Sequence, residues 1–293
     1  MPARAGDGAL TLRRLIVCAD DFGLDAAVNE AVECAHRDGI LTAASLMVGA
    51  PAAADAVARA RRLPGLHVGL HLVLVAGRPV LPAQQVPALV GSDGAFRAGL
   101  VRAGFRFFFR RRARQQLARE IAAQFDAYRA TGLALDHVNA HCHMHLHPTV
   151  GRLVVALARD YGVRAVRIPA EPVAVLRRAG ADPAACATAA FHAPFAALLR
   201  RRVRRAGLVA NDRLLGLAWS GGLTESRLLR LLDALPPGVS EVYCHPAMSR
   251  PAPLVRAMPY YRHRDEFDAL VSPAVRQRVA AGAIALIGYR ALG

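Results

Sequence analysis

Lysine is absent from this chain of 293 residues, so all 38 of its lysine-or-arginine positions are arginine. The absence excludes a Schiff-base lysine and a Walker A phosphate loop, because both require that residue. The arginines give a net charge of +16, a basicity typical of nucleic-acid-binding proteins. No RRM, helix-turn-helix or zinc-finger pattern accompanies it, and the abundance of arginine and alanine indicates a coding bias that inflates the charge. We therefore expect no nucleic-acid partner.

Cysteine is also scarce, and its positions are scattered. The five cysteines are Cys18, Cys34, Cys142, Cys186 and Cys244. Their number is odd and none forms a CxxC pair. We therefore expect neither a disulfide framework nor a cysteine-based zinc module.

Long apolar runs are missing as well. No run approaches the roughly 18–20 residues that span a bilayer, and the opening "MPARAGDGALTLRRL" has no apolar stretch typical of a signal peptide. We therefore expect a cytoplasmic protein. The length, with 54% hydrophobic residues, can bury a large core, which favours a single domain over residues 1–293.

Short β-like runs alternate with helical runs along most of the chain. The β-like runs are 13–22, 40–49, 67–75, 135–143, 163–169, 213–219, 239–246 and 283–289. Repeated βα units predict a parallel sheet covered by helices. At this length they favour a closed or distorted TIM-like (β/α) barrel. Residues 76–99 and 170–212 fit the pattern poorly and are expected as long loops over the active face.

Polar side chains follow several of these β runs. They are Asp20 and Asp21, His67 and His71, His141, His143 and His145, and His245. In a (β/α) barrel the active site forms where strands end and loops begin. These residue types therefore lie where chemistry is expected.

The segment "HCHMHLHP" starts at His141. His141 and His145 would share one face of a helix, as in HExxH zinc proteases, but Cys142 takes the place of the glutamate. Pro148 suits the first turn of a following helix. A strand is favoured instead, in which His141, His143 and His145 would point the same way. The alternative is a solvated histidine-rich loop.

Asp20, Asp21 and His71 have ordinary alternatives too. An aspartate can cap a helix, although Asp25 serves that role as well, and a buried histidine can bond a backbone carbonyl. An aspartate with two histidines from separate strands nevertheless suits a divalent metal. A metal activates water and polarises a carbonyl. The second aspartate could take the water's proton, and a histidine opposite could protonate the leaving group. This chemistry is amide or ester hydrolysis.

Several blocks of the sequence resemble a known family. They are "LIVCADDFGLDAAVNEAV", "GILTAASLMV", "VGLHLVL", "DHVNAHCHMHLHP" and "EVYCHP". In this order they resemble the YdjC-like carbohydrate deacetylases, over about residues 13–290. The resemblance implies a TIM-like barrel and the metal-dependent removal of an N-acetyl group from an amino sugar. By matched motif it implies Asp21, His71 and His141 as metal ligands, Asp20 as general base and His245 as general acid.

The same resemblance implies one divalent ion, Mg²⁺ or Zn²⁺. It also implies that His143 and His145 line the pocket or support the metal shell. One position departs from the family pattern, because many relatives have Asp-Ser where this chain has Asn139-Ala140. Asn139 can still bond to a metal ligand, but it carries no charge.

Two longer blocks, which begin "GILTAASLMVGAPAAAD" and "GLAWSGGLTESRLLR", resemble most closely the hopanoid-biosynthesis-associated branch, HpnK. This implies an N-acetylglucosaminyl hopanoid lipid as substrate. Residues 105–114 and 195–207 mix apolar side chains with arginine clusters. Such stretches can lie on the inner face of an anionic membrane as a peripheral contact. The alternative is a solvated arginine face with its aromatic residues packed inward.

Two further residues complete the candidate site. Arg167 lies at a strand end, where it could hold Asp20 ionised through a charge-assisted bond, or it could be an ordinary surface arginine. Trp219, the only tryptophan, could stack on a sugar ring or belong to the core.

Three hypotheses follow for the function. The first is metal-dependent N-deacetylation of a glycosylated lipid. The second is the same reaction on soluble sugars such as chitooligosaccharides. The third is a non-enzymatic metal-binding or scaffold protein in a membrane-associated pathway.

Overall fold

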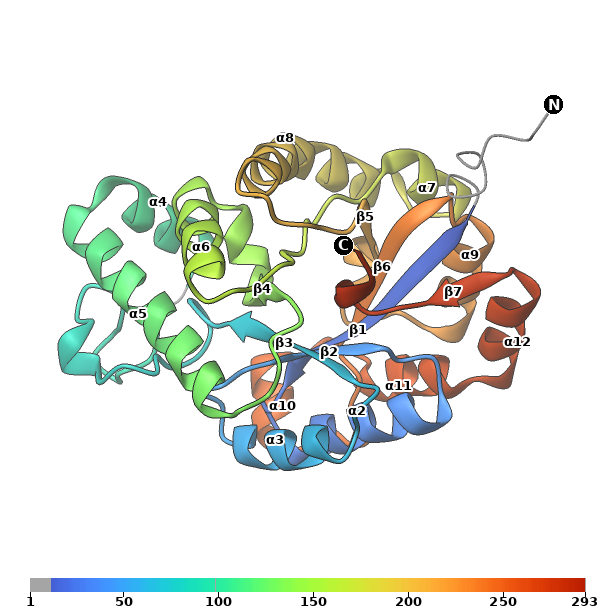
Figure 1. The fold of residues 1–293 in the computed structure, drawn as a ribbon, viewed down its shortest axis with the longest axis horizontal. Coiled ribbons are helices and arrows are strands. Elements are labelled where there is room, and N and C mark those ends of the chain that lie inside the picture. Colours follow the sequence, from blue (N-terminus) through green and yellow to red (C-terminus); the bar gives the residue numbers. More distant parts are fainter. Residues whose placement is uncertain (1–11, 98, 293) are drawn as a thin grey trace.

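The computed structural model describes residues 12–97 and 99–292, so most of the opening segment examined for a signal peptide lies outside the described residues, as do the ends of the expected 1–293 domain. A seven-stranded parallel sheet forms the centre of the described part (Figure 1). The strands are β1 (Arg13–Phe22), β2 (Ala43–Leu46), β3 (His67–Leu72), β4 (Val138–Ala140), β5 (Arg213–Leu215), β6 (Gly238–Cys244) and β7 (Ile284–Leu286). Their order is β4-β3-β2-β1-β6-β5, with β7 beside the first residues of β1.

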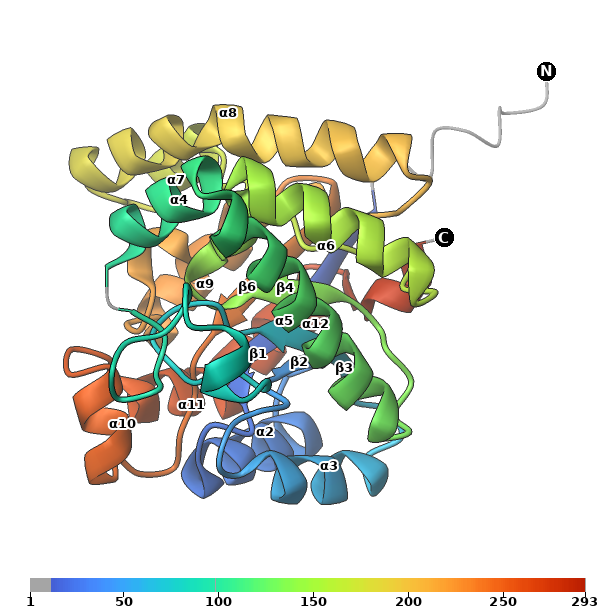
Figure 2. The same ribbon diagram turned by 90° about the vertical axis from the view of Figure 1, so that its left-hand side faces the viewer.

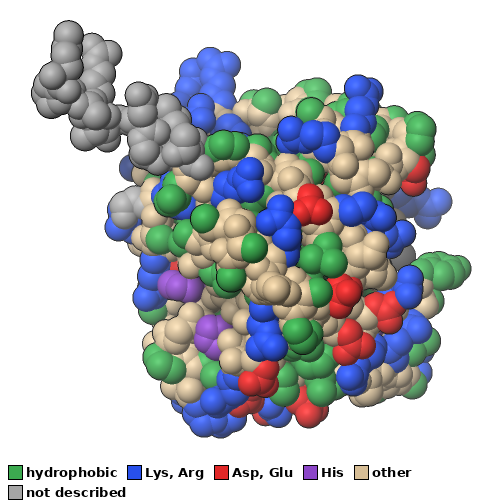
Figure 3. All heavy atoms as spheres, turned by 90° about the vertical axis from the view of Figure 1, so that its right-hand side faces the viewer, with side chains coloured by type: hydrophobic (Ala, Val, Ile, Leu, Met, Phe, Trp, Pro, Cys, Tyr) green, Lys and Arg blue, Asp and Glu red, His purple; other side chains and the backbone are tan. Residues whose placement is uncertain are grey.

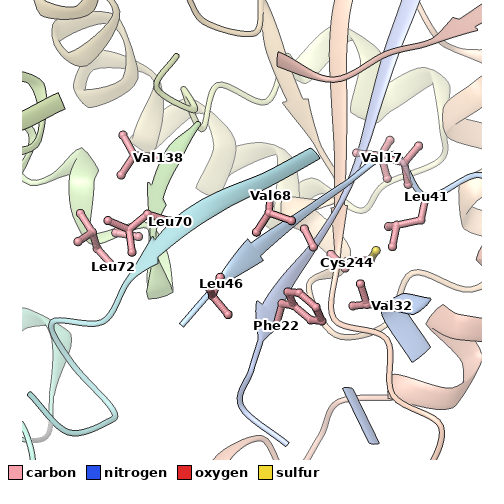
Figure 4. Close-up of a cluster of buried hydrophobic side chains, with 14 of the residues drawn as sticks. Val17, Phe22, Val32, Leu41, Leu46, Val68, Leu70, Leu72, Val138 and Cys244 are labelled. Atoms are coloured by element: carbon pink, nitrogen blue, oxygen red, sulfur yellow. The ribbon is translucent and has the colours of Figure 1, made fainter. Parts of the chain in front are cut away.

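Strand β1 is the middle of this sheet, and its sequence explains why. Eight consecutive residues, 15–22, are buried, as expected for a strand covered on both faces. It pairs with β6 along one edge, and with β7 and then β2 along the other. In Figure 4, Val17 and Phe22 of β1 lie in the same apolar cluster as Leu46 of β2 and Val68 of β3.

The sheet curls, and an irregular segment joins its two outer strands. Val166 bridges to Val138 of β4, and Ala165 bridges to Val209. Further along, the amide of Leu214 in β5 donates to the carbonyl of Ala170 at 2.9 Å. The expectation of a regular strand at 163–169 is therefore wrong, because this segment makes single bridges rather than a continuous ladder. The structure shows an α/β fold with a curled parallel sheet.

Helices cover the outside of the sheet (Figures 1 and 2). They are α2 (Ala26–Asp38), α3 (Ala53–Arg61), α4 (Leu100–Phe109), α5 (Arg111–Ala130), α6 (Pro148–Asp160), α7 (Val173–Arg178), α8 (Pro183–Arg205), α9 (Glu225–Asp233), α10 (Ala252–Ala257), α11 (His263–Val271) and α12 (Pro273–Ala281). Among the described residues, no helix is both long enough and apolar enough to cross a membrane.

The segments that connect the strands differ in part from what the sequence predicts. Residues 100–130 form two helices, because Arg110 is extended (φ −99°, ψ 109°) and breaks the pattern. Residues 170–212 are mostly helical rather than a loop, since they contain α7 and the 23-residue α8. Residues 76–97 are largely irregular, as expected.

On the face drawn in Figure 3, arginine is spread out rather than gathered in a single stripe. Figure 3 shows basic side chains distributed over the whole of one face, with acidic side chains between them. A nucleic-acid-binding surface would concentrate them along one face or helix. This face gives no support to a nucleic-acid partner.

Candidate active site

Strand β1 ends in two buried aspartates that both reach one histidine. Asp21 has φ +63°, in the left-handed region that few non-glycine residues adopt. Asp20 Oδ1 lies 4.0 Å from Nδ1 of His71, and Asp21 Oδ1 lies 3.3 Å from Nε2 of the same ring. The turn at the end of β1 thus brings consecutive carboxylates to one site, although adjacent residues of a regular strand point apart.

Asp21, His71 and His141 form a compact group of metal-ligand type. One nitrogen or oxygen from each lies within 4.8 Å of the others. Asp21 Oδ1 is 3.1 Å from His141 Nδ1. Among the described residues, Asp21 Oδ2 and His71 Nε2 are buried without a hydrogen-bond partner. Because buried polar atoms normally have a partner, these two atoms fit a divalent cation, and the donor set suits one.

The charge of Asp21 also acts on His141. Burial opposes protonation of the ring, but the Asp21 carboxylate outweighs it and holds the pKa of His141 well above its usual value. Burial likewise opposes ionisation of Asp21, and His141 leads the groups that keep the pKa of Asp21 well below its usual range. The pair therefore attracts a proton or, in its place, a cation.

The histidine run does not continue β4 as expected. The strand ends at Ala140, and residues 141–146 form a tight 3-10 turn in which Cys142 and His143 are left-handed, both with φ 51°. The three histidines therefore do not share a strand face, and each has its own surroundings. His147 precedes Pro148, which begins α6.

His143 and His145 differ in their environments. His143 lines the main cavity, and its ring lies 5.1 Å from that of Tyr243. Burial, with His145 and Arg167 nearby, lowers the pKa of His143 well below its usual value, so the ring is neutral. His145 is fully buried, and its Nε2 lies 3.1 Å from the carbonyl oxygen of Arg167. It therefore supports the backbone at Arg167 and is not part of the cavity lining.

Asn139 holds His71 from behind. Its side-chain oxygen lies 2.7 Å from Nδ1 of His71, which directs Nε2 toward Asp21. The Asn139 amide nitrogen donates to Asp20 at 3.3 Å and to Ser45 at 2.8 Å. Asparagine at this position therefore still bonds to the histidine, as anticipated from the departure in the sequence.

Arg167 is completely buried and contacts two carboxylates, so it is not a surface arginine. It donates to Asp20 at 2.6 Å and to Glu241 at 2.9 Å. Burial of Asp20 disfavours its charge, but Arg167 and then His71 outweigh that effect and hold the pKa of Asp20 well below its usual range. Asp20 is therefore a carboxylate that can accept a proton at any physiological pH.

His245 directly follows β6 and also lines the cavity. Burial lowers its pKa to about 4. Its Nδ1 lies 3.9 Å from Glu266 of α11, and Glu266 also accepts the backbone amide of His245. Burial raises the pKa of Glu266 to about 7. His245 is thus neutral at pH 7, with a partly protonated carboxyl group beside it.

A cavity of about 520 Å³ connects these groups with the surface. Asp20, His71, His141 and His245 are among the residues that line it. Its outer wall is formed by Leu100 and Gly104 of α4, by Pro148 of α6, and by Thr188, His192 and Phe195 of α8. Helix α8 lies in the segment expected as a loop over the active face, so the location was right although the conformation was wrong.

Comparisons with known proteins show the family of this chain. Residues 14–281 match the family described as YdjC-like protein. The chain belongs to the YdjC-like family. It is 33% identical over 281 residues to a protein named carbohydrate deacetylase from Geobacillus stearothermophilus, which covers 95% of this chain and 97% of that protein. A protein of the same name from Vibrio cholerae is 32% identical over 284 residues, covering 95% and 96%.

A solved structure shares the fold of this YdjC-like chain. It is described as a putative cellobiose-phosphate cleavage protein from Enterococcus faecalis V583. The TM-score is 0.75 at 23% sequence identity, over 96% of this chain and 98% of the other. At that identity the likeness speaks for the fold alone.

Two other candidate residues lie apart from the cavity lining of this YdjC-like protein. Trp219 is 9% exposed and packs in the core, with the Arg227 guanidinium 5.7 Å from its ring centre, which fits the core alternative. His67 begins β3, at the opposite end of the strand from His71, and contacts Asp136 at 3.2 Å.

Sequence reasoning missed Glu266, Tyr261 and Ser45. Glu266 and Tyr261 belong to a helix and its preceding turn, where nothing in the spacing relates them to His245. Ser45 lies inside β2, among small apolar residues. Its polarity in a buried strand was the one available signal.

Proposed function

We propose that this YdjC-like chain is a metal-dependent hydrolase that removes the acetyl group from an N-acetylated amino sugar. The observation that carries the proposal is the meeting of Asp21, His71 and His141, with two unpartnered buried ligand atoms, beside the ionised Asp20. The names of the relatives from Geobacillus and Vibrio support the same activity.

Each residue of the site then has a definite task. A divalent cation held by Asp21, His71 and His141 would activate a water and polarise the acetamide carbonyl. Asp20 accepts the water's proton, and Arg167 keeps it ionised for that purpose. His245 protonates the departing amine.

His245 has to receive a proton before it can act as the general acid. With a pKa of about 4, its ring is neutral at pH 7 and must gain a proton before it can donate one. Glu266 lies 3.9 Å from Nδ1 and, with a pKa of about 7, carries a proton part of the time at pH 7. Because His245 is the weaker base of the two, transfer from Glu266 to its ring has to be coupled to transfer from the ring to the departing amine. The two histidines and one carboxylate suit Zn²⁺, and the flanking carboxylate also allows Mg²⁺.

We further propose that the substrate is lipid-linked, in particular an N-acetylglucosaminyl hopanoid of the kind implied by the likeness to the HpnK branch. Within residues 12–97 and 99–292, eight of the twelve large exposed hydrophobic residues lie on two helices that line the cavity. They are Leu100, Val101, Phe105, Phe108 and Phe109 of α4, and Phe191, Phe195 and Leu198 of α8. Exposed apolar side chains gathered on two helices beside a cavity are typical of an interaction site.

The same two helices support a peripheral membrane contact. No acidic residue occurs between Asp93 and Glu120, a stretch that contains eight arginines, nor between Asp182 and Asp212. Apolar side chains flanked by arginine suit the anionic inner face of a cytoplasmic membrane. We place the protein in the cytoplasm at that face, with the cavity mouth toward the bilayer.

Vesicle binding tests the membrane contact. The full chain should co-sediment with vesicles containing phosphatidylglycerol and less with phosphatidylcholine alone. Phe105→Ser with Phe109→Ser should remove binding, whereas the matched pair Leu12→Ser with Leu286→Ser should not, because Leu12 directly precedes β1 and Leu286 ends β7, so neither belongs to α4 or α8. If wild type did not bind these vesicles at low salt, the membrane contact would be refuted. It would also be refuted if the double phenylalanine variant still bound vesicles but lost a dimer that wild type forms.

The acetate assay tests the activity and the substrate separately. Wild type should release acetate from an N-acetylglucosaminyl lipid, and Asp20→Ala should lose nearly all of this activity. If wild type and Asp20→Ala released acetate at the same rate, Asp20 could not be the general base. Faster turnover of chitooligosaccharides than of the lipid would favour the soluble substrate, and metal binding without any turnover would favour a scaffold.

We also propose that residues 1–293 form a single domain whose curled sheet is a distorted TIM-like barrel. Residues 164–170 would then occupy the place of a missing strand between β4 and β5.

A further inference from the structure

A chain of buried polar side chains runs from the site to the opposite end of the sheet. Its members are Ser45, His137 and Asp136, which are 0 to 3% exposed. None of them touches the cavity, and the proposed reaction uses none of them. Buried polar groups are costly unless hydrogen-bonded, so the connections between them are informative.

The direction of this hydrogen-bond chain is set at Asp136. Its carboxylate receives hydrogen bonds from the backbone amides of Tyr289 and Arg290, and its oxygens lie 3.1 and 3.2 Å from Nδ1 of His137 and of His67. A carboxylate only accepts, so Nδ1 of His137 carries a hydrogen. In the neutral ring Nε2 is then an acceptor.

The same reasoning continues through Ser45. Its hydroxyl lies 3.0 Å from Nε2 of His137 and therefore donates to it. The Ser45 oxygen is left to accept from the amide nitrogen of Asn139, at 2.8 Å. Asp20, another pure acceptor, favours the same orientation but lies further from that nitrogen, at 3.3 Å.

The orientation of Asn139 decides the state of His71. With its nitrogen toward Ser45, its oxygen faces Nδ1 of His71 at 2.7 Å and accepts a hydrogen from it. Nε2 of His71 is then a bare lone pair, buried and pointing toward Asp21. A flipped Asn139 would instead require a hydrogen on Nε2, which blocks metal binding.

The surroundings of His137 are shaped to hold it. A Cβ on Gly69 would approach the His137 ring to 2.5 Å, so only glycine leaves room for the ring there. On its other side the ring stacks on Tyr289, with centres 4.6 Å apart and planes at 22°. The Tyr289 hydroxyl donates to Glu241, which pairs with Arg167 and so with Asp20. The His137 ring is therefore held in one position by close packing on both sides.

We propose that Ser45, His137 and Asp136 are positioning residues that hold His71 as its Nδ1–H tautomer, with Nε2 bare for the cation. The inference deepens the proposed function, on whose metal site it rests. Residues behind a ligand that fix its tautomer typically change metal affinity by 10–100-fold when altered. These hydrogen bonds extend the support of His71 beyond Asn139, through the interior of the protein.

The tautomer can be read directly in the metal-free protein. Two-bond ¹H–¹⁵N correlation spectra of ¹⁵N-histidine-labelled protein should show the hydrogen of His71 on Nδ1. In Ser45→Ala and in His137→Phe, a population with the hydrogen on Nε2 should appear, and competition with a chelator should show Zn²⁺ affinity about 10-fold weaker or more. Ser45→Thr, which keeps the hydroxyl, should restore both.

Tyr289→Phe is the matched control. It loses a buried hydrogen bond to Glu241 but keeps the stack on His137 and the chain to Asn139, so the His71 tautomer and Zn²⁺ affinity should stay at wild-type values even if stability falls. An Nε2–H tautomer in wild type, or an unchanged tautomer in both Ser45→Ala and His137→Phe, would overturn the inference. Acetate release is measured separately, so an inactive protein with the expected tautomer would refute only the proposed function.

Discussion

At the scale of single residues, the ion pair between Arg167 and Asp20 matters most for the site. Both side chains are buried, and Arg167 also neutralises Glu241. Breaking a buried pair from one side leaves an uncompensated charge, which costs far more than the pair itself contributes. The arginine thus links the stability of the fold to the charge of the proposed base.

Arg167→Met should therefore lower the free energy of unfolding by about 3–5 kcal/mol and raise the pKa of Asp20. Urea unfolding measures the first effect. Arg167→Lys, which keeps a charge, should lose less. Equal stability of Arg167→Met and wild type would show that Asp20 and Glu241 do not depend on the guanidinium.

Glu171 predicts a pH dependence. Burial raises its pKa to about 7 from 4.5, although the backbone amides of Gly216, Leu217 and Ala218 donate to it. The folded state then holds a proton that the unfolded state has lost, so this contribution to stability is complete below pH 4.5 and disappears as the pH rises through 7.

Glu171→Gln should remove this part of the pH dependence of the unfolding free energy. Between pH 4.5 and 7.5, the stability of wild type relative to the variant should fall by about 3 kcal/mol, from about 1.4 kcal/mol per pKa unit. Chemical unfolding at a series of pH values measures the difference. A constant difference across this range would contradict the raised pKa.

At the scale of elements, the turn after β4 departs most from the expected structure. Alternating histidines imitate the two-residue period of a strand, but Cys142 and His143 adopt left-handed conformations. Neither of these two positions is a glycine or an asparagine, the residues from which a left-handed turn could be predicted. This strained turn, which costs of order 1–3 kcal/mol per residue, places His141 against Asp21.

Cys142 allows a test of this strain because its side chain is exposed. Cys142→Gly should raise the free energy of unfolding by about 0.5–1 kcal/mol, since glycine avoids the left-handed cost of roughly 1–2 kcal/mol but loses about 0.5–1 kcal/mol more conformational entropy on folding. Cys142→Val should lower it by a similar amount or more, because a β-branched residue is least suited to this region. Thermal unfolding compares the two, and the reverse order would show that the turn is not left-handed.

Other elements were predictable for clear physical reasons. The apolar run of β1 and the aspartates that follow it predicted that strand over its full length, and Asp25, named as a possible cap, does cap α2. Residues 170–212 were expected as a loop, but Pro183 begins α8 and Pro194 lies within it. Hydrogen bonds between neighbouring strands, such as that of Asn139 with Ser45, have no sequence signature.

At the scale of the whole molecule, the two ends of the sheet have different tasks. The carboxyl ends of β1, β3, β4 and β6 bring the aspartates and histidines to one cavity, whose mouth lies between α4 and α8. The opposite end anchors them through His137, Asp136 and Tyr289. The sequence predicted the first end from its motifs, whereas the second depends on packing inside the sheet.

The central claim is that Asp21, His71 and His141 together hold a catalytic divalent cation. Anomalous diffraction from crystals of the full chain grown with Zn²⁺ tests it most directly. We expect one strong peak about 2.0–2.2 Å from a carboxylate oxygen of Asp21 and from nitrogens of both histidines. A peak bound by other residues, with none at these three, would contradict it.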